Sequence, residues 1–248
     1  MKCSGQDTFL IRKGTVMKIG SGEWKELIKG GLKELGIHIT GKDMDMFAIH
    51  ACEMLHWNKK INLTAISDPG EIAVKHFIDA LAPLSMIKKD KSILDIGSGG
   101  GFPGLPLKIV MPSLNVILVD GSRKKISFLN HVIRKLKLEN IQAVHIRAEE
   151  MGKDVNFKNR FDVVMSRALS SLKNFVKLAL PLIIQEGTII AMKGEIGKKE
   201  MGLLHTYLKN NFPLSDENNI NYNLTLQKYL LPYTKAKRTL VRLKLTVS

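Results

Sequence analysis

The stretch Lys91-Ser-Ile-Leu-Asp95-Ile-Gly97-Ser-Gly99-Gly-Gly101-Phe-Pro-Gly104 decides the fold. An apolar strand runs into Asp95 and then into a glycine-rich turn. Gly97 and Gly99 can adopt backbone angles closed to other residues and bring main-chain N–H groups close to a ligand, while Pro103 suits the start of a helix. The stretch therefore predicts a nucleotide-cofactor loop between a strand and a helix, with a plain surface turn as the alternative.

The glycines alone fit two classes of cofactor. The Asp-x-Gly-x-Gly-x-Gly pattern that begins at Asp95 is typical of S-adenosylmethionine sites, whereas Gly-x-Gly-x-x-Gly from Gly99 fits the dinucleotide fingerprint. A carboxylate at Asp95 suits the ammonium group of S-adenosylmethionine and would repel a pyrophosphate. Asp120 ends a second apolar strand, where its carboxylate can accept hydrogen bonds from both ribose hydroxyls. Because both cofactors need such a residue, Asp120 supports a nucleotide-binding fold but does not distinguish S-adenosylmethionine from a dinucleotide.

The charge balance points to a polyanionic partner. Lys and Arg total 38 against 23 Asp and Glu, which gives a net charge of +15 over 248 residues. Each phosphate that such a surface neutralises also releases counterions, so RNA is favoured, and a solvated basic surface is the alternative. Two basic clusters are candidate RNA contacts: Arg123, Lys124, Lys125, Arg134, Lys135 and Lys137 on an expected helix, and Lys235, Lys237, Arg238, Arg242 and Lys244 in the tail.

The patterns of cysteine, histidine and hydropathy argue against a disulfide-linked, a metal-binding or a membrane-spanning protein. Cys3 and Cys52 have no paired spacing, so we expect neither a disulfide framework nor a thiolate zinc site. The seven histidines show no metal-ligand spacing, and we expect no metal, with His50 and His56 on a helix surface. No apolar run reaches the roughly 18 residues of a spanning helix, and residues 1–20 lack a signal-type core. We therefore expect a cytoplasmic monomer without membrane contact.

The length suits one domain with an appendage. Residues 1–20 lack periodicity and are expected to be a disordered extension or the result of a start codon placed too early. From Glu23 to Trp57, apolar residues recur at three- and four-residue spacing, which predicts a small N-terminal helical cap over 21–66. Residues 67–248 form the expected main domain.

In the main domain, short apolar strands alternate with amphipathic helices. Strands are expected at 92–96, 115–119, 141–146, 161–166 and 187–192, and helices near 103–111, 123–137, 171–184 and 197–210. This alternation predicts an α/β fold with a doubly wound, Rossmann-like parallel sheet. After a polar loop at 215–222, residues 223–230 and 238–246 predict an antiparallel pair joined at Pro232. Such a pair is typical of class I S-adenosylmethionine-dependent methyltransferases, whereas a dinucleotide domain more often continues with a crossover helix.

Residues after the fourth strand narrow the methyl acceptor, because that strand ends beside the transferred group. The sequence there is Ser166-Arg167-Ala168 and lacks the Asp/Asn-Pro-Pro-aromatic loop of exocyclic amino-group enzymes. Both cysteines precede the cofactor loop, which disfavours carbon-5 pyrimidine chemistry. A ring nitrogen such as guanine N7 stays attractive, since its in-plane lone pair attacks without prior deprotonation. Catalysis then rests on aligning the ring nitrogen with the methyl group and on stabilising the positive charge that passes from sulfur to the base.

The order of several motifs resembles one family. These motifs are 62–66 (Asn-Leu-Thr-Ala-Ile), 76–81 (His-Phe-Ile-Asp-Ala-Leu), the loop 95–104, Asp120 with Lys124-Lys125 and Phe128-Leu129, 147–150 (Arg-Ala-Glu-Glu), 166–168 and Lys193-Gly194. Over residues 45–247 the chain is similar to the ribosomal RNA small-subunit methyltransferase G family, also called glucose-inhibited division protein B. The resemblance implies methyl transfer from S-adenosylmethionine to N7 of a guanine in the decoding-region loop of 16S rRNA, in RNA or in the small ribosomal subunit.

The resemblance also implies roles for single residues. Gly97 and Phe102 match the family's cofactor-loop contacts. Ala148 and Glu149 match the pair that meets the adenine, and Arg167 matches an arginine beside the methyl-transfer site. Gly121 and Ala80 stand where the family usually has serine, so hydroxyl contacts are not expected there. The expected cofactor site is therefore Asp95, Gly97, Gly99, Gly101, Phe102, Asp120, Ala148, Glu149 and Arg167.

Arg167, Asn62 and Lys193 are the candidate catalytic residues, and each has a structural alternative. Arg167 contacts the guanine edge, a phosphate or the cofactor carboxylate, or it pairs with a nearby acid. Asn62 holds the target base or caps a helix. Lys193 meets an RNA phosphate or the cofactor carboxylate, or it faces solvent. His76 and Asp79 share a helical face, where they line the target pocket or tie the cap to the core.

Three other functions stay open at this point. Methylation of another RNA, a protein or a small molecule would differ in whether the incorporated label is lost to ribonuclease. An RNA-binding assembly factor would bind RNA without cofactor turnover. A nucleotide-binding dehydrogenase would be stabilised by nicotinamide cofactors rather than by S-adenosylmethionine.

Overall fold

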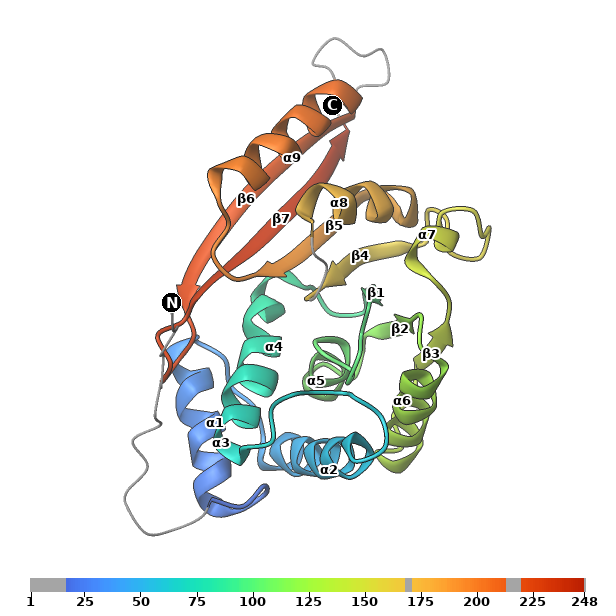
Figure 1. Ribbon diagram of the computed structural model, residues 1–248. Helices are drawn as coiled ribbons and strands as arrows, with labels where there is room; N and C mark the ends of the chain where they lie inside the picture. Colours follow the sequence, from blue (N-terminus) through green and yellow to red (C-terminus); the bar gives the residue numbers. More distant parts are fainter. Residues whose placement is uncertain (1–16, 168–170, 213–219, 248) are drawn as a thin grey trace, which may run out of the picture.

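A seven-stranded sheet with helices on both faces forms the fold (Figure 1). The computed structural model describes residues 17–167, 171–212 and 220–247. The strand order is β3-β2-β1-β4-β5-β7-β6. β1 to β5 pair in parallel, and β7 runs antiparallel to both β5 and β6. The strands are β1 (Ser92–Ile96), β2 (Asn115–Asp120), β3 (Ile141–His145), β4 (Phe161–Ser166), β5 (Ile183–Lys193), β6 (Ile220–Leu230) and β7 (Lys237–Val247).

The central parallel strands are buried on both faces, and their sequences are therefore continuous apolar runs. Ile93 of β1 packs into one apolar cluster and Leu94 into the other, because successive side chains of a strand point to opposite faces. Leu94 is in register with Ile117 of β2 and Val164 of β4. Residues 116–119 of β2 are all buried for the same reason. The sheet therefore supplies two apolar faces, and each needs a helical layer.

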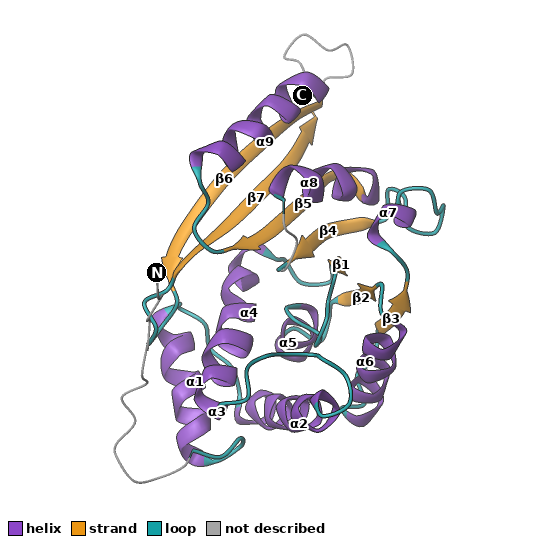
Figure 2. Cartoon of the chain, in the orientation of Figure 1, coloured by secondary structure: helices purple, strands orange, loops and turns teal. Residues whose placement is uncertain are grey.

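The first helical layer comes from the N-terminal part of the chain (Figure 2). Its segments are α1 (Gly22–Glu34), α2 (Gly41–Asn58), α3 (Pro69–Glu71), the π-helix η1 (Ile72–Ile78), α4 (Asp79–Leu81) and the 3-10 helix η2 (Ala82–Met86). Ser21 caps α1, and Thr40 begins α2 with a capping box. Trp24 of α1 and Phe47 of α2 both pack on Phe77 of η1. These aromatic contacts join the N-terminal helices to the segment that follows them.

The remaining helices complete both layers. Leu105 of α5 and Phe128 of α6 belong to the apolar cluster of α1 and α2, whereas Phe175 of α8 and Leu204 of α9 belong to the cluster on the opposite face. The bounds are α5 (Gly104–Val110), α6 (Arg123–Lys135), α7 (Ala148–Met151), α8 (Leu172–Ala179), the 3-10 helix η3 (Leu180–Leu182) and α9 (Lys198–Asn211).

The expected parallel sheet and terminal antiparallel pair are confirmed, with shifts at two elements. The helix expected to reach residue 184 ends at Ala179, because Pro181 lacks the N–H that would continue it, and β5 begins at Ile183. Residues 220–222 of the expected polar loop pair with β7 as part of β6. The rest of that loop, and residues 1–16 of the expected extension, lie outside the described residues. Met17 and Ile19 pack against the first apolar cluster.

Candidate active site

The predicted site residues follow the carboxyl ends of the five parallel strands. Parallel strands place these ends at one edge of the sheet, where ligands bind open α/β sheets. The strand order changes direction between β1 and β4, which is the switch point of the topology. Along this edge the residues follow strands in the order Ala148 and Glu149 (β3), Asp120 (β2), Gly97 to Phe102 (β1), Arg167 (β4) and Lys193 (β5).

Gly97 and Gly99 leave open space beside the loop. Their φ angles are +73° and +55°, in the left-handed region that favours glycine. A Cβ on Gly97 would have no atom within 4 Å, and the nearest neighbour of one on Gly99 would be the Gly97 carbonyl oxygen at 3.9 Å. The Gly97 N–H donates to the Val119 carbonyl at 2.9 Å, which fixes the loop on β2. These two glycines therefore form a cradle that a side chain would fill.

Asp120 closes the cradle from β2. Its Oδ2 accepts the Gly99 N–H at 3.1 Å and its Oδ1 accepts the Ser122 N–H at 2.8 Å. Lys125 Nζ lies 3.8 Å from the same carboxylate. Each carboxylate oxygen has more than one acceptor position, so Asp120 can hold the loop and still accept a hydroxyl group.

Gly101 and Gly104 are required by packing instead. A Cβ on Gly101 would lie 2.3 Å from Leu105 Cδ1. One on Gly104 would lie 2.3 Å from Leu118 Cδ2 and 2.9 Å from Asp95 Oδ2. Gly104 therefore allows α5 to pack closely on the sheet, and Gly101, whose φ is +91°, leaves room for Leu105. The contact of Gly101 with a cofactor stays a prediction.

Asp95 lies fully buried beneath the loop. Its Oδ2 accepts the Gly104 N–H at 3.0 Å, while Oδ1 has no hydrogen-bond partner among the described residues. Burial raises the pKa of this carboxyl group to about 7, against the lowering effect of the Gly104 hydrogen bond. Because both Asp95 and its unpaired oxygen are buried, the expected contact with the ammonium group of a cofactor stays a prediction.

Phe102 is stacked between two histidines and is only 4% exposed. Its ring lies 4.8 Å from that of His50 and 4.7 Å from that of His76, nearly parallel to both. The expectation that His50 lies on a helix surface is wrong: His50 is fully buried, and its Nε2–H donates to the Gly100 carbonyl at 2.7 Å. Burial lowers the pKa of His50 to about 4. His50 therefore supports the loop from α2 as a neutral ring, and His56 is exposed as expected.

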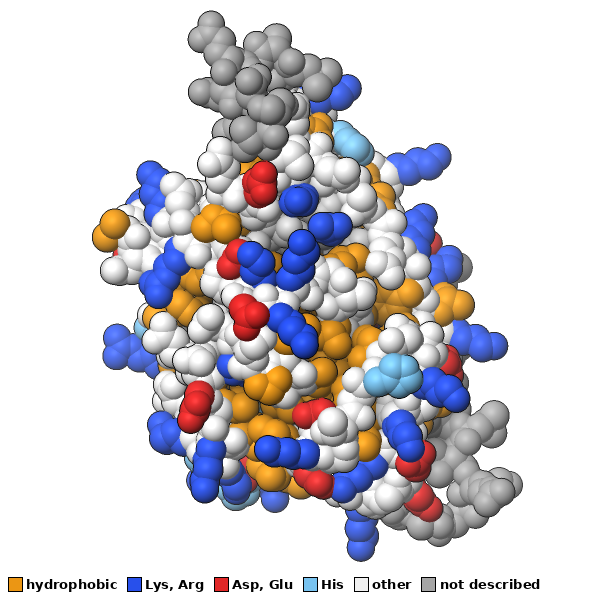
Figure 3. Space-filling model, turned by 180° about the vertical axis from the view of Figure 1, so that it is seen from behind, with side chains coloured by type: hydrophobic (Ala, Val, Ile, Leu, Met, Phe, Trp, Pro, Cys, Tyr) orange, Lys and Arg blue, Asp and Glu red, His pale blue; other side chains and the backbone are white. Residues whose placement is uncertain are grey.

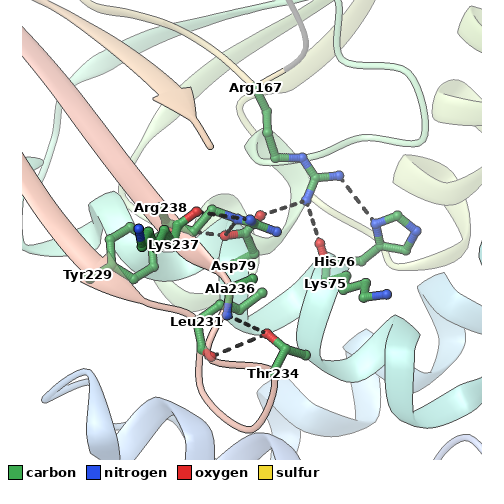
Figure 4. A network of polar contacts seen from close by, with 10 residues as sticks. All are labelled: Lys75, His76, Asp79, Arg167, Tyr229, Leu231, Thr234, Ala236, Lys237 and Arg238. Carbon is green, nitrogen blue, oxygen red and sulfur yellow. Dashed lines mark hydrogen bonds and ion pairs between the residues drawn. The ribbon is translucent and has the colours of Figure 1, made fainter. Parts of the chain in front are cut away.

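Arg167 joins the end of β4 to the π-helix η1 (Figure 4). Its Nη1 donates to the Lys75 carbonyl at 2.9 Å and its Nη2 to His76 Nδ1 at 3.3 Å. Its Cζ lies 5.1 Å from the centre of the Phe102 ring, a cation–π geometry. Because arginine only donates, His76 accepts at Nδ1, and its Nε2–H donates to Thr64 Oγ1 at 2.9 Å. Burial, and then the charge of Arg167, lower the pKa of His76 to about 3.

Asp79 ties this cluster to the terminal hairpin (Figure 4). Its Oδ1 accepts the Tyr229 hydroxyl at 2.9 Å and Arg238 Nε at 3.2 Å, and its Oδ2 lies 3.8 Å from Arg167 Nη1. Burial and the Asp79 charge raise the pKa of Tyr229, so the phenol stays protonated and donates. The structural alternative for His76 and Asp79 is confirmed, since they connect the N-terminal part of the chain to β4 and to the terminal hairpin. They also line a cavity, and that this cavity holds the target base stays a prediction.

The cavity beside this cluster, here called the basic pocket, has a volume of about 310 Å³. That volume is at the lower end of the roughly 300–1,000 Å³ of small-molecule sites. Lys193 lines the pocket and forms an ion pair with Glu200 at 2.9 Å. Its side chain is 18% exposed, so Lys193 is not the fully solvent-facing residue of the structural alternative. The lining residues are Ile66, Lys75, His76, Asp79, Arg167, Met192, Lys193, Gly194 and Arg238.

Two of the predicted site residues, Asn62 and Glu149, lie outside the contacts around Arg167 and Asp79. Asn62 is exposed on the loop after α2, and the neighbouring Asn58 organises that loop by accepting the Leu63 and Thr64 N–H groups and donating to the Thr64 carbonyl. Glu149 is exposed at the start of α7 and lines a surface hollow near α8. Ala148 beside it is half-buried.

Sequence reasoning missed the site roles of Asn58, Tyr229 and Arg238. The sequence predicts Arg238 only as one of the basic residues in the tail. Its hydrogen bond to Asp79 shows that it belongs to the candidate active site. No spacing signal links these residues, because more than 150 positions separate Asn58 from Tyr229. Among the described residues, no group of three or more His, Cys, Asp or Glu side chains could hold a metal ion.

Comparison with known proteins identifies the family. The profile of rRNA small subunit methyltransferase G, GidB, matches residues 44–212. The chain belongs to this family. It is 46% identical to the ribosomal RNA small subunit methyltransferase G of Geotalea uraniireducens, over 71% of this chain and 80% of that protein. It is 39% identical to the protein of that name from Geobacter sulfurreducens, over 88% and 95%.

Solved structures bear out the fold. P. horikoshii TYW2 in complex with MeSAdo superposes with a TM-score of 0.52 and 16% identity, over 69% of this chain and 63% of that one. The expected family and the expected class I methyltransferase fold are therefore confirmed. As a member of the GidB family, the protein is a methyltransferase whose cofactor is S-adenosylmethionine. Among the described residues, no helix is long and apolar enough to cross a membrane.

Proposed function

We propose that this protein transfers a methyl group from S-adenosylmethionine to N7 of a guanine in the decoding-region loop of 16S rRNA. The observation that carries the proposal is the division of the sheet edge at the switch point. The open glycine cradle with Asp120 lies over β1 and β2, and the basic pocket with Arg167 follows β4 and β5. Family membership supports small-subunit rRNA as the substrate.

The cofactor half of the site has groups for each part of S-adenosylmethionine. Asp120 would accept the ribose hydroxyls, and Ala148 with Glu149 would meet the adenine. The unpaired oxygen of Asp95 would attract the ammonium group. Gly97 and Gly99 leave the space that the ligand needs close to the backbone.

The chemistry of the basic pocket supports an acceptor that needs no deprotonation. S-adenosylmethionine supplies the methyl group: the N7 lone pair forms the new bond as the sulfur–carbon bond breaks, and the positive charge passes from sulfur to the base. No proton leaves N7 in this step. His76 is hydrogen-bonded at both ring nitrogens and has a pKa of about 3, so it is a poor general base.

Arg167, Asp79 and Lys193 would position the base and stabilise charge. A guanidinium group has five N–H donors, and the hydrogen bonds of Arg167 to described residues use two of them. Another donor can bind guanine O6 or a phosphate. The Asp79 carboxylate lines the pocket and offsets the positive charge that the base acquires. Lys193 at the rim is placed for a phosphate or the cofactor carboxylate.

The substrate form and the cellular setting are part of the same proposal. Either 16S rRNA or the small ribosomal subunit is the partner, and the enzyme acts as a cytoplasmic monomer. The net charge of +15 supports an RNA partner. Lys and Arg side chains are spread over the face shown in Figure 3, with Asp and Glu side chains among them.

Methyl-labelled S-adenosylmethionine and small ribosomal subunits that lack the modification provide the direct test. After incubation with the protein, the RNA is cleaved chemically at N7-methylguanine. A single cut in the decoding-region loop of 16S rRNA is the expected result. Label that resists ribonuclease, or label at another atom of the RNA, would contradict the proposed acceptor.

Variants separate the two halves of the site. Asp120→Asn removes the charge that accepts the ribose hydroxyls, so we expect weaker cofactor binding. Arg167→Lys loses the guanidinium fork, so we expect a lower rate with cofactor binding retained. Asp90→Asn, at an exposed position, is the matched control and should change neither. Normal methylation by both site variants, with thermal unfolding unchanged, would rule out this site assignment.

A further inference from the structure

A second hollow, here called the hairpin groove, adjoins the basic pocket. Its volume is about 680 Å³, and Arg238 lines both hollows. The chain also leads directly from one to the other, since Gly194 lines the basic pocket and Glu195 lines the groove. The groove lies between the β6–β7 hairpin and the start of α9. It therefore lies next to the proposed methyl-transfer site.

The strand pattern gives the groove an apolar and cationic wall. Leu226, Lys228 and Leu230 alternate along β6, so their side chains project from one face of the hairpin. Lys237 of β7 is in register with Leu230. Leu226 is 44% exposed and Leu230 is 57% exposed, although both are large apolar residues. Exposed apolar side chains gathered in one hollow are typical of a contact surface.

The charge of the groove favours an anionic occupant. Three lysines line it, namely Lys198, Lys228 and Lys237, whereas Arg238 directs its guanidinium from the opposite face of the hairpin to Asp79. Glu195 is the single acid among its described lining residues, and it pairs with Lys237 at 3.2 Å. Sites for single-stranded nucleic acid combine a cationic groove that follows the phosphates with side chains, most often aromatic, against which bases pack. In this groove Leu226 and Leu230 provide an aliphatic surface for such packing.

We propose that the hairpin groove binds the nucleotide next to the target guanine in the substrate RNA. Its base packs against Leu226 and Leu230, and its phosphates contact Lys198 and Lys228. The inference rests on the proposed RNA methyltransferase function and adds a second subsite to it. A target base that leaves its stack deprives its neighbour of a stacking partner, and the groove supplies a replacement surface. Recognition then extends beyond the methylated base to the strand beside it.

Charge reversal tests the phosphate contacts. In Lys198→Glu/Lys228→Glu we expect the KM for the small-subunit substrate to rise at least about tenfold, and the salt dependence of RNA binding to weaken by about one contact per lysine. Lys89→Glu/Lys209→Glu changes the net charge equally at exposed positions outside the groove and is the matched control. Cofactor affinity should stay unchanged in both. Equal KM values for the two double variants would overturn the proposal.

Photocrosslinking identifies the occupant. Leu230 is replaced with p-benzoylphenylalanine, and Leu203, which is 50% exposed on α9 outside the groove, is replaced in the same way as control. With intact small subunits and S-adenosylhomocysteine, we expect an RNA adduct next to the target guanine from position 230 alone. An adduct to a ribosomal protein, or no adduct, would overturn the proposal.

Methylation by the wild-type protein is measured in parallel with both tests. A wild-type protein that methylates normally while the groove results fail contradicts the groove alone. A wild-type protein that transfers no methyl group to RNA contradicts the proposed function itself.

Discussion

The buried carboxylate of Asp79 balances the positive charges of two arginine side chains, Arg167 and Arg238. It also accepts a hydrogen bond from the Tyr229 hydroxyl. Asp79→Asn keeps the size of the side chain but leaves Arg167 and Arg238 without their shared counter-charge. Breaking buried charge-assisted hydrogen bonds costs roughly 1–3 kcal/mol, so we expect the free energy of unfolding to fall by about that amount. Urea unfolding followed by circular dichroism measures the change.

Asp45→Asn is the control for this prediction. Asp45 pairs with Lys25 on the surface, and its side chain is 61% exposed. Exposed ion pairs contribute about 0–1 kcal/mol, so its replacement should have a much smaller effect. Equal losses in the two variants would mean that the Asp79 cluster adds no stability.

His50 makes the stability depend on pH. Its folded-state pKa of about 4 lies below the usual histidine value of 6.5, so between these two pH values the unfolded chain binds more protons than the folded one. Its contribution to stability is therefore fully present above about pH 6.5 and is lost as the pH falls towards 4. Asp95 opposes this trend, because its raised pKa makes its contribution fall as the pH rises from about 4 to 7.

His50→Phe keeps a ring against Phe102 but removes the titrating group. We expect the slope of unfolding free energy against pH, measured between pH 4 and 6.5, to decrease by about 1.4 kcal/mol per pH unit at most. His38→Phe replaces an exposed histidine and should leave the slope unchanged. An unchanged slope in His50→Phe would show that His50 titrates normally in the folded protein.

Contiguous motifs made part of the site predictable at the scale of single residues. Asp95, Gly97 and Asp120 could be predicted because each closes or follows a strand with a strong apolar pattern. Phe102 was expected to contact the cofactor, but the ring stacks between His50 and His76, which come from α2 and η1. Packing between distant segments carries no local sequence signal, so this arrangement needed the tertiary structure.

At the scale of elements, some glycines of the loop after β1 face open space, as Gly97 does, and others lie against neighbouring side chains, as Gly104 does. Gly97→Ala places a methyl group in the open cradle at a φ of +73°. We expect it to weaken S-adenosylmethionine binding strongly and to lower stability by about 1–2 kcal/mol through backbone strain. Isothermal titration and thermal unfolding measure the two effects separately.

Gly36→Ala is the matched control for the cradle. Gly36 has a φ of +71° and, like Gly97, no atom within 4 Å of an added Cβ, but it lies after α1 and away from the loop. It should cost similar stability and leave cofactor binding intact. Equal cofactor affinity in the two variants would contradict the assignment of the cradle.

Gly104→Ala tests the packing role of the same loop. Its Cβ would lie 2.3 Å from Leu118 Cδ2 and 2.9 Å from Asp95 Oδ2, so these buried side chains or α5 must move. Overpacking of this kind costs about 1–3 kcal/mol, and we expect a lower unfolding temperature. A variant as stable as the wild type would show that Leu118 can move aside without cost.

At the scale of the whole molecule, the excess of positive charge sets how RNA binding responds to salt. For about 6–10 phosphate contacts, affinity falls by roughly 10³–10⁵ between 50 and 200 mM salt. We expect a steep loss of this kind for small-subunit RNA, measured by filter binding. S-adenosylmethionine carries no phosphate, so its affinity should change little over the same range. RNA affinity that is flat with salt would contradict the electrostatic interface.

Local sequence patterns were enough to predict the parallel sheet, the terminal antiparallel pair, the cofactor loop and the family. These features follow from apolar period, glycine position and strand-end residues, which are local properties of the chain. Only the tertiary structure decided that Asp79 joins Arg167, Tyr229 and Arg238. It also decided that the hairpin groove adjoins the basic pocket. The physical reason is that β7 pairs with β5, so the turn end of the β6–β7 hairpin, with Tyr229 and Arg238, lies beside Asp79 of α4, and no local pattern encodes such long-range packing.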